Sequence, residues 1–555
     1  MATSPKHSYI RFFTVVVALL LGLILVRLAF LTLQDQSQSK TYTNPQVASK
    51  VVRGTIYDRN HRILAIQTPY WGVYFHLNYI KDLQVVSELV APYVQMSPQQ
   101  VQDKAKQYTT YAQIKARIDE DQVPALLATL EKHKLTKEVT VEKRLGRTYP
   151  ALFHASQTLG FINSEQEGIE GVELSQEHYL NPYPEVGQGE VTYGEDITLT
   201  LDLDIQYALD VQLQFIADEH NPDYAMALVL DATNGDILGM SSYPWYDVNS
   251  LSTSTAVQRK NHAANLLFEP GSVFKLFSLA TVLEAGQANV AEPFLCDGSY
   301  TFSTGSSNVT INCTAKHGLI DPKTMVAKSC NGAIVHWAMQ TDADLFYETL
   351  TKLGFNSSYD IGLPSRPRAQ IAEPSTWSGR SQATISFGQE MLASALHLAA
   401  AATALTQEGE LLQPHLILSR SDAVTSGKTY QRERTVLAKV FSSEVAKTVR
   451  EGMQQATEEG GTGVKAVVEG VDVGIKTGTA QLLDPETNTY EDGTVLASSL
   501  AMVPIDNPRY IIYFGAGNPK GNTIWGSNIA GPAIANVVKA LLSQGKLVAK
   551  DTEIR

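Results

Sequence analysis

The sequence predicts an α+β catalytic domain built on an antiparallel sheet with helices, preceded by an elongated mixed domain and one transmembrane helix. Three observations lead to this architecture. A long apolar run lies near the N-terminus, strand-like segments of alternating polarity recur from residue 190 onward, and helical stretches separate these segments. At 555 residues the chain is too long for a single hydrophobic core, so we expect several domains.

The apolar run is Ile10–Leu33, and its 24 residues would span about 36 Å as a helix, enough to cross a bilayer core of about 30 Å. A cleavable signal would be shorter and would end in a small-x-small site, whereas this run leads into Phe30–Leu33. Lys6 and Arg11 favour an N-terminus (residues 1–9) in the cytoplasm and everything after the span outside. We expect Arg27 to snorkel toward the outer interface; a polar contact with another membrane protein's helix is the alternative.

Residues 34–189 are predicted to form a polar linker, 34–50, and then a mixed domain that we call the pedestal. Residues 55–57 and 71–75 are typical of strands, and residues 83–93 and 124–134 are typical of helices. No constellation in this region indicates chemistry, so we expect it to position the catalytic domain or to bind a partner.

Residues 190–549 are predicted to form the catalytic domain, followed by a tail at 550–555. Asp196–Leu203 alternates in polarity as a strand does, and Ile205–Asp218 has helical spacing of its apolar residues. Asn234-Gly235 stands between two further apolar segments, 225–230 and 236–241, and predicts a β-hairpin in which both turn residues adopt positive φ.

Charge and cysteine usage exclude other classes. The chain has 44 basic and 57 acidic residues, a net charge of −13, which leaves no electrostatic footprint for nucleic acid. The cysteines are Cys296, Cys313 and Cys330, and no CxxC or Cys/His cluster joins them, so no metal site is expected. Cys296 and Cys313 either form a disulfide outside the membrane or remain free. Cys330 is interpreted as a small filler at a helix start.

The segment 269–286 carries the first chemical motif. Its apolar residues cover nearly every face, which is typical of a buried helix that begins after Pro270-Gly271 and ends at Gly286. Ser272 and Lys275 lie three residues apart on one face of its first turn. Burial would lower the lysine pKa to about 7–8 and make it a usable base for the serine hydroxyl. The alternative is a capping serine beside a snorkelling lysine.

Two further segments place polar residues at the start of an apolar helix and at the end of an apolar strand. Ser329-Cys330-Asn331 is predicted to start a largely apolar helix. Lys476-Thr477-Gly478-Thr479 falls on a predicted strand whose pleat puts Lys476 and Gly478 on one face. A glycine there permits close approach of another backbone, such as a peptide substrate at the strand edge, and the lysine could bind a carboxylate. Each segment alone is compatible with an ordinary surface.

In the order S-x-x-K, S-x-N, K-T-G the three motifs are highly specific, and together they resemble the penicillin-binding proteins and β-lactamases. Over nearly its whole length the chain is similar to class B penicillin-binding proteins, whose fold is the penicillin-binding/β-lactamase-like transpeptidase fold. Residues 53–65 resemble the family's R-G-x-I-x-D-R-N-G-x-x-L-A box, with His61 in place of the usual glycine. Residues 147–150 and 168–173 resemble the later pedestal motifs. No glycosyltransferase domain precedes the pedestal, which points away from class A.

The resemblance implies a peptidoglycan D,D-transpeptidase that works through an acylated Ser272. Lys275 would act as general base, Ser329 would relay a proton to the leaving amine, and Asn331 would hold the substrate amide. The donor's terminal carboxylate would be bound at a second group, Lys476, Thr477, Gly478 and Thr479. The backbone N–H groups of Ser272 and Thr479 would form an oxyanion hole, in which one donor typically contributes about 2.7–4 kcal/mol. No metal or cofactor is implied.

The resemblance also implies partners and location. Substrates are stem peptides ending in D-Ala-D-Ala, β-lactams acylate the serine, and a polytopic glycosyltransferase and divisome proteins are the expected partners. The protein would be a single-pass protein of the cytoplasmic membrane with its catalytic domain outside. Residues 160–163 ahead of Gly168–Gly171 look more like the division type than the elongation type.

Three alternatives stay open on the sequence. A β-lactamase of class A would add a Glu-x-x-Leu-Asn segment between Ser329 and Lys476, and no Glu is followed there by Asn four residues later. A D,D-carboxypeptidase differs only in using water as acceptor. A catalytically silent cell-wall scaffold would not require all the motif residues that are intact here.

Overall fold

A computed structural model describes residues 21–22, 27, 51–183, 191–305, 307–483 and 490–550. Most of the predicted transmembrane segment 10–33, the linker up to residue 50 and the tail from 551 lie outside these residues. In the part of the chain that is described, no helix is both long and apolar enough to cross a membrane. Residues 51–183 and 193–555 belong to one unit.

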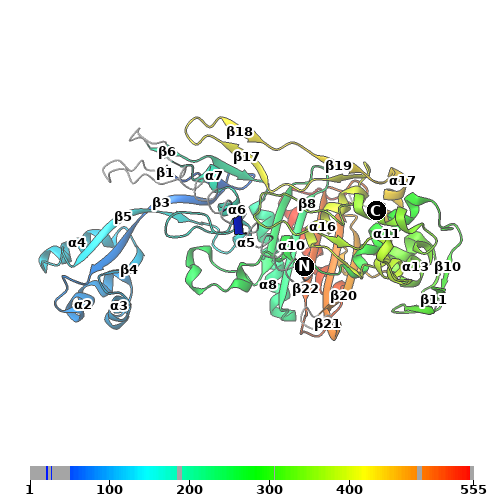
Figure 1. Cartoon of the computed structure of the whole chain (residues 1–555), viewed down its shortest axis with the longest axis horizontal. Helices are drawn as coiled ribbons and strands as arrows, with labels where there is room; N and C mark the ends of the chain where they lie inside the picture. The colour runs from blue at the N-terminus through cyan, green and yellow to red at the C-terminus, as the bar shows by residue number, and fades with distance from the viewer. Residues whose placement is uncertain are drawn as a thin grey trace, which may run out of the picture. The chain divides into compact units, whose positions relative to one another are not determined.

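The predicted antiparallel sheet is confirmed as five strands in the order β20-β21-β22-β8-β9 (Figure 1). All four neighbouring pairs are antiparallel. The strands are β20 (Gly474–Leu483), β21 (Tyr490–Val503), β22 (Tyr510–Gly517), β8 (Tyr224–Asp231) and β9 (Ile237–Tyr243). Strand β20, which carries the K-T-G motif, lies at one edge, so one side of its backbone is not covered by a neighbouring strand of this sheet.

Alternate residues of β8 contribute to two separate cores, as the pleat of a strand requires. Met226, Leu228 and Leu230 join the larger core, which contains α11 (Lys275–Ala285) and α16 (Ala395–Ala402). The other alternate residues, Ala225, Ala227 and Val229, point to the opposite face and join a second core with α8 (Leu203–His220) and α18 (Gly526–Ser543). The sheet is therefore covered by helices on both faces, which explains the continuous apolar run of β8.

The β8–β9 hairpin is confirmed, but its turn is not the predicted one. Gly235 has a positive φ of 81°, whereas Asn234 does not adopt positive φ. The Asn234 side chain instead accepts a hydrogen bond from the N–H of Asp236 at 2.8 Å, and Gly235 N–H donates to Asp231 O at 2.9 Å. The connection is thus a longer loop that an asparagine side chain stabilises.

The segment predicted as a buried helix over 269–286 begins as a 3₁₀ turn, η3 (Gly271–Phe274), and continues as α11. Every residue from Lys275 to Val282 is buried, and Gly286 ends the helix at φ 63°. The predicted C-terminal glycine cap is therefore confirmed. The tight first turn carries Ser272 and the first α-helical residue is Lys275.

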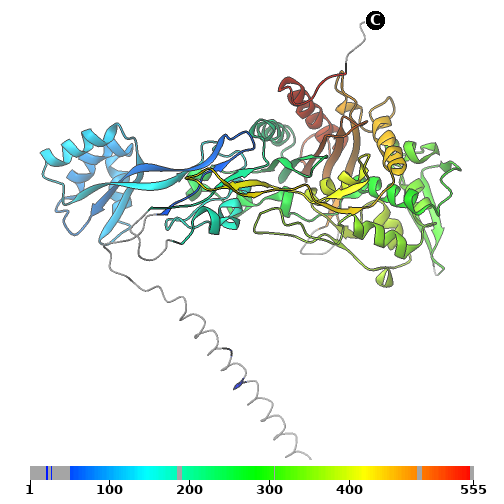
Figure 2. The same ribbon diagram turned by 90° about the horizontal axis from the view of Figure 1, so that it is seen from above.

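A seven-stranded sheet joins strands from both sides of the predicted boundary at residues 189–190. Its order is β18-β17-β7-β2-β3-β4, with β5 paired to β3. The strands are β2 (Ile56–Tyr57), β3 (Ile63–His76), β4 (Tyr111–Ile118), β5 (Val139–Thr148), β7 (Asp196–Leu199), β17 (Ile417–Ser421) and β18 (Lys428–Gln431). The β17–β18 hairpin, yellow in Figures 1 and 2, reaches back toward the blue strand β3. The strand predicted over Asp196–Leu203 is shorter, because α8 already begins at Leu203.

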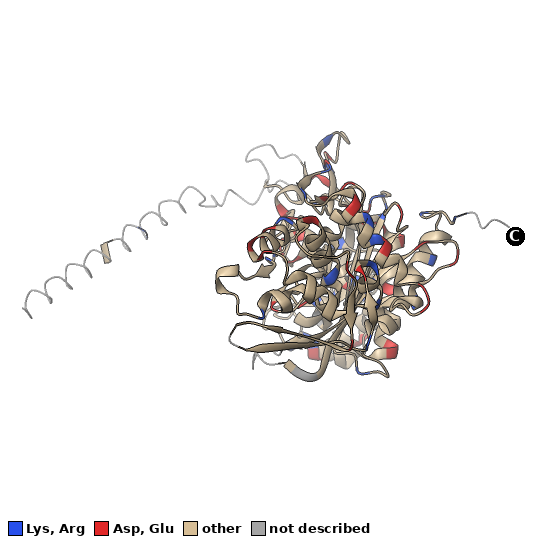
Figure 3. Ribbon diagram, turned by 90° about the vertical axis from the view of Figure 1, so that its right-hand side faces the viewer, with Lys and Arg blue, Asp and Glu red and all other residues tan. Residues whose placement is uncertain are grey.

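Three helices pack against the far part of this sheet and close the pedestal core. They are α2 (Leu83–Val94), α3 (Pro98–Ala105) and α4 (Gln122–Lys132), and the first and last confirm the helices predicted at 83–93 and 124–134. Val90 and Leu126 on the helices meet Val73 and Phe75 of β3 in one buried cluster. In Figure 3, basic and acidic residues are interspersed over the described elements that face the viewer.

The three pedestal motifs meet in a buried ion-pair network. Arg53 Nη2 lies 2.7 Å from Glu173 Oε2, and Arg147 Nε lies 2.6 Å from Glu173 Oε1. All three side chains are at most 1% exposed. Arg53 also pairs with Glu177 at 2.7 Å, and Arg147 Nη1 donates to Gly54 O at 2.7 Å. Glu173 therefore holds together three segments that are far apart in the sequence.

We expect Glu173→Ala to lower the free energy of unfolding by about 3–5 kcal/mol, because it leaves the buried Arg147 without its carboxylate and Arg53 with Glu177 alone. Urea unfolding of the full chain, followed by circular dichroism, measures the change. Glu142→Ala is the matched control, since its pair with Arg144 is exposed (45% and 37% side-chain exposure) and is worth at most about 1 kcal/mol. Equal effects of the two substitutions would contradict the role assigned to Glu173.

Candidate active site

Residues of the three motifs converge on one hydroxyl group. Ser329 Oγ accepts a hydrogen bond from Lys476 Nζ at 2.8 Å and another from Lys275 Nζ at 3.1 Å. Lys275 opens α11, Lys476 lies on β20, and Ser329 follows α12 (Pro322–Lys328). Elements separated by up to about two hundred residues of sequence therefore place two lysines and one serine within hydrogen-bonding distance.

Lys275 is fully buried and uses its donors on the second motif. Besides Ser329 Oγ, its Nζ donates to Ser329 O at 2.7 Å and to Asn331 Oδ1 at 2.5 Å. Burial lowers the pKa of Lys275 to about 8, as predicted from its place on an all-apolar helix. Ser272 is half-buried one turn earlier, and among the described contacts Lys275 is directed to Ser329 and Asn331 rather than to Ser272.

Lys476 is also fully buried, and its Nζ donates to Thr477 O at 2.8 Å as well as to Ser329. Burial lowers the pKa of Lys476 well below its usual value, and the positive charge of Lys275 lowers it further. Each charged lysine therefore disfavours the charged state of the other. An anion placed beside this pair would relieve that conflict, so the site is electrostatically suited to a carboxylate.

The helix predicted to start at the second motif is confirmed as α13 (Asn331–Ala338), with Cys330 as its N-cap. Ser329 does not cap it but ends α12 in the left-handed conformation, with φ 57°. A non-glycine residue in that conformation is strained, and such strain is often found at functional sites. Asn331 Nδ2 donates to Asn312 O at 2.8 Å, which leaves Asn331 Oδ1 directed at Lys275.

Gly478 allows a close approach, but the approaching group is part of the protein. A Cβ at Gly478 would lie 2.9 Å from Val273 Cγ2 and 2.9 Å from Ser498 Oγ. Gly271, at φ 56°, lies against Ala480 in the same way: a Cβ at Gly271 would lie 2.7 Å from Ala480 Cβ. The two glycines therefore let the turn that carries Ser272 pack directly on β20. On either side of Gly478, Thr477 is buried and Thr479 Oγ1 accepts a hydrogen bond from Gly526 N–H at 3.3 Å.

The sequence did not predict the surroundings of the three cysteines. Cys296, Cys313 and Cys330 lie with His317 in a group whose sulfur and nitrogen atoms are all within 4.8 Å of one another. The expectation that no Cys/His cluster joins the cysteines is therefore wrong. All three thiols are free, and Cys313 lies 3.8 Å from Cys330 rather than bonded to Cys296. The signal in the sequence was the Cys313-x-x-x-His317 spacing, which is too common to be informative alone.

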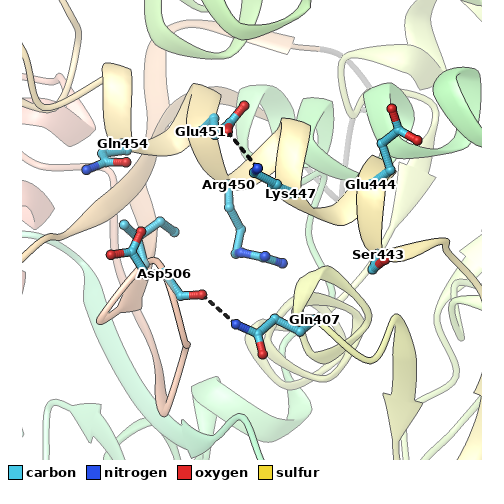
Figure 4. Close-up of a pocket in the computed structure, with 9 residues that line it drawn as sticks. Gln407, Ser443, Glu444, Lys447, Arg450, Glu451, Gln454 and Asp506 are labelled. Atoms are coloured by element: carbon cyan, nitrogen blue, oxygen red, sulfur yellow. Dashed lines mark hydrogen bonds and ion pairs between the residues drawn. The ribbon is translucent and has the colours of Figure 1, made fainter.

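A cavity of about 620 Å³ lies elsewhere, and none of the residues around it belongs to the three motifs. Figure 4 shows Arg450 of α17 (Ser443–Gln455) pointing into it. Arg450 Nη1 donates to Leu405 O at 2.6 Å, and Gln407 Nε2 donates to Asp506 O at 2.9 Å. The first contact ties α17 to Leu405, and the second joins two segments outside this helix. The buried lysine pair, rather than cavity size, identifies the reactive centre.

Two protein families match most of the chain. Residues 225–541 match the family described as penicillin binding protein transpeptidase domain, and residues 48–196 match the family described as penicillin-binding protein dimerisation domain. The probable peptidoglycan D,D-transpeptidase PenA of Neisseria gonorrhoeae is 29% identical, over 94% of this chain and 89% of that protein. The probable peptidoglycan D,D-transpeptidase FtsI of Caulobacter vibrioides is also 29% identical, over 88% of this chain and 80% of that protein.

Among solved structures, penicillin binding protein 3 of Mycobacterium tuberculosis in complex with aztreonam has a TM-score of 0.72 and 23% sequence identity. The match covers 90% of this chain and 98% of that chain. At this level of identity the likeness shows a shared fold.

We expect Gly478→Ala to destabilise the protein by about 1–3 kcal/mol, because its methyl group would overlap Val273 and Ser498. Gly531→Ala is the matched control. Gly531 lies inside α18, and its Cβ would meet only Lys465 Cβ at an ordinary 3.7 Å, so alanine there should be neutral or stabilise by about 0.5–1 kcal/mol. Thermal unfolding of both variants tests the difference in sign. Two equal shifts would contradict the packing role of Gly478.

Proposed function

The chain belongs to the penicillin-binding protein transpeptidase family, and on that premise we propose that it cross-links peptidoglycan through an acyl-enzyme formed on Ser272. Its activity is that of a peptidoglycan D,D-transpeptidase and target of β-lactams, similar to FtsI and penicillin binding protein 3. The observation that carries the mechanism is the placement of Ser329 Oγ between the buried Nζ atoms of Lys275 and Lys476. This arrangement can move a proton, and its excess positive charge favours an anionic substrate.

Binding of the donor stem peptide prepares the base. The terminal carboxylate of D-Ala-D-Ala is bound by Lys476, Thr477 and Thr479 on β20, the edge strand of its sheet. A carboxylate beside Lys476 favours its charged form, and the neighbouring Lys275 then gives up its proton more readily. Lys275, with a pKa of about 8, is thereby neutral when the substrate is in place and accepts the proton of Ser272.

The acylation step follows from these positions. Ser272 Oγ attacks the carbonyl carbon of the penultimate D-Ala, and the oxyanion is stabilised by the backbone N–H groups of Ser272 and Thr479. The C–N bond to the terminal D-Ala breaks. The proton held by Lys275 passes through the Ser329 hydroxyl to the leaving amine, a path supported by the 3.1 Å hydrogen bond. Asn331 holds the amide of the donor beside Lys275.

Deacylation reverses the proton path. The amine of a neighbouring stem peptide attacks the ester carbonyl, and the C–O bond to Ser272 breaks. The proton of the amine returns through Ser329 and Lys275 to the Ser272 oxygen, and a new amide bond joins the two stems. A β-lactam acylates Ser272 in the same way. Its leaving nitrogen stays tethered to the acyl group, so the acceptor position remains obstructed and the adduct persists.

We assign the protein to the division type of class B enzymes and propose that it acts at the septum. The similarity to FtsI and penicillin binding protein 3 supports this assignment. Residues 10–33 are proposed as a single membrane anchor, with the N-terminus inside and the catalytic residues outside the cytoplasmic membrane. A polytopic glycosyltransferase that supplies glycan strands is the proposed partner.

Labelling with a fluorescent penicillin tests the nucleophile. We expect a stable, stoichiometric adduct that mass spectrometry places on Ser272, and no adduct with Ser272→Ala. Ser278→Ala, at a buried position two turns further along α11, is the matched control and should label normally. Rapid release of the label would indicate a β-lactamase, and an adduct that persists in Ser272→Ala would remove the role of this serine. A product assay with stem peptides then separates amide formation from hydrolysis.

The pH profile of acylation tests the base. Since only the neutral form of Lys275 can accept a proton and its pKa is about 8, the second-order rate constant should rise about tenfold per pH unit below 8 and level off above it. The penicillin carboxylate stays ionised over this range. Lys275→Arg, which remains protonated, should lose acylation and the pH dependence. A flat profile in the wild-type protein from pH 6 to about 9 would exclude Lys275 as the base.

A further inference from the structure

Four potential metal ligands come together beside the second motif, from four separate positions in the chain. Cys296 ends β10 (Phe294–Cys296), Cys313 follows β12 (Asn308–Asn312), His317 precedes β13 (Gly318–Ile320), and Cys330 precedes α13. Pairing of Cys296 with Gly318 across β10 and β13 brings the first cysteine to the histidine. The group includes every cysteine of the chain.

The distances match one coordination geometry. Cys313 Sγ lies 3.8 Å from Cys330 Sγ, and Cys296 Sγ lies 3.4 Å from His317 Nδ1. A tetrahedral zinc ion with bonds of about 2.3 Å to sulfur and about 2.0–2.1 Å to nitrogen separates its ligand atoms by about 3.4–3.8 Å. A disulfide would require a sulfur–sulfur distance of about 2.05 Å. Two of the ligand separations therefore match a tetrahedral zinc site, and all four ligand atoms lie within 4.8 Å of one another.

We propose that Cys296, Cys313, His317 and Cys330 bind one structural Zn²⁺ ion. Three thiolates and one imidazole are the donor set of closed, four-coordinate zinc sites, and soft sulfur ligands disfavour magnesium and calcium. The site is closed because all four positions are filled by protein, so the ion would have a structural rather than a catalytic role.

The neighbouring groups support metal-bound thiolates. Gly332 N–H donates to Cys313 Sγ at 3.2 Å, and the N–H of Cys313 donates to Gly298 O at 2.9 Å, which fixes the backbone at this ligand. Lys328 Nζ donates to His317 O at 3.4 Å and brings a positive charge near a site of net charge −1. Hydrogen bonds of this kind hold ligands in position and tune a metal site.

The segment that carries three of the ligands has few fully buried side chains of its own. Residues 294–320 form two short two-stranded sheets, β10–β13 and β11–β12 (β11 is Ser299–Ser303). Leu295 and Leu319 are exposed, and few side chains of this segment, chiefly Cys296, Phe302 and Ile320, are buried. Small segments with so little core commonly depend on a metal or a disulfide.

The fourth ligand ties this segment to the reactive centre. Cys330 lies between Ser329 and Asn331, both of which accept hydrogen bonds from Lys275. Asn331 Nδ2 donates to Asn312 O, one residue before Cys313. A zinc ion would therefore hold the strained turn at Ser329 from two sides, and Cys330 acts as a positioning residue for the second motif.

The test begins with metal content, which does not depend on enzymatic activity. The untagged full chain in detergent, purified with no added metal, should contain one zinc per chain by mass spectrometry of the metal. Removal with a chelator should lower the unfolding temperature and slow labelling by fluorescent penicillin at least tenfold, and added ZnCl₂ should restore both. Co²⁺ in place of zinc should give the intense absorption of tetrahedral cobalt thiolates.

Matched variants locate the site. Cys296→Ser and His317→Gln should each lose most of the bound zinc. His336→Gln is the control, since His336 contacts Tyr300 of the same segment but lies outside the cluster, and it should keep the metal. If the cysteine variant fails to fold, the chelation and cobalt measurements on the wild-type chain still decide whether the chain has a tetrahedral thiolate site. Zinc retained by both ligand variants would overturn the proposal.

Alkylation separates zinc from a disulfide. In denaturant with chelator and without reductant, all three cysteines should react, whereas a disulfide would leave only one reactive thiol and would contradict the zinc site. The effect on labelling rests on the proposed function, but the metal content does not. A chain that binds one zinc yet never labels would refute the transpeptidase mechanism and leave the metal site standing.

Discussion

Two lysine side chains buried against a single hydroxyl group are the constraint around which the catalytic domain is built. An ammonium group without hydration is costly, and two such groups also repel each other. The protein compensates with oxygens, supplied by Ser329, Asn331 and Thr477. Those oxygens must come from a helix end and a strand edge at the same time. The left-handed turn at Ser329 and the glycines at 271 and 478 are the local consequences, because each permits an approach that an ordinary residue in ordinary backbone would prevent.

The pedestal also buries charge, but there the charge is balanced. Arg53 and Arg147 share Glu173, and Glu177 supplies a second carboxylate to Arg53. That network stabilises one arrangement of three segments and has no need of an additional ion. The lysine pair lacks a carboxylate partner among its described contacts, so its balance must come from a ligand. Burying charged side chains is costly in both domains. In the pedestal the cost is balanced by carboxylates that fix the structure, whereas in the catalytic domain it favours binding of an anionic substrate.

Periodicity predicted the elements well because it reflects burial, which is the force that forms them. The continuous apolar run of β8, the all-apolar α11 and its glycine cap were all readable from local sequence. Contacts between distant segments were not. The edge that β17 and β7 share, the packing of Val273 on Gly478 and the length of the Asn234 loop depend on which groups meet in space. The catalytic motifs were recognised because they are specific in combination. The cysteines stand 17 residues apart, a spacing that matches no common metal-binding motif, and they acquire meaning only when β10 and β13 pair.

Cys330 shows how a residue of a local helix start also takes part in contacts between distant segments. It is the N-cap residue of α13, yet its side chain makes no capping hydrogen bond. Serine or asparagine at such a position would stabilise a helix by about 1 kcal/mol relative to a residue that cannot cap. A thiol is a poor cap, so capping does not explain a cysteine between the two polar residues of the motif. A sulfur that must reach Cys313 and His317 does explain it. On this argument the reactive centre depends on a segment with a thin core, and the ion that holds that segment is also what fixes the turn from which Ser329 meets both lysines.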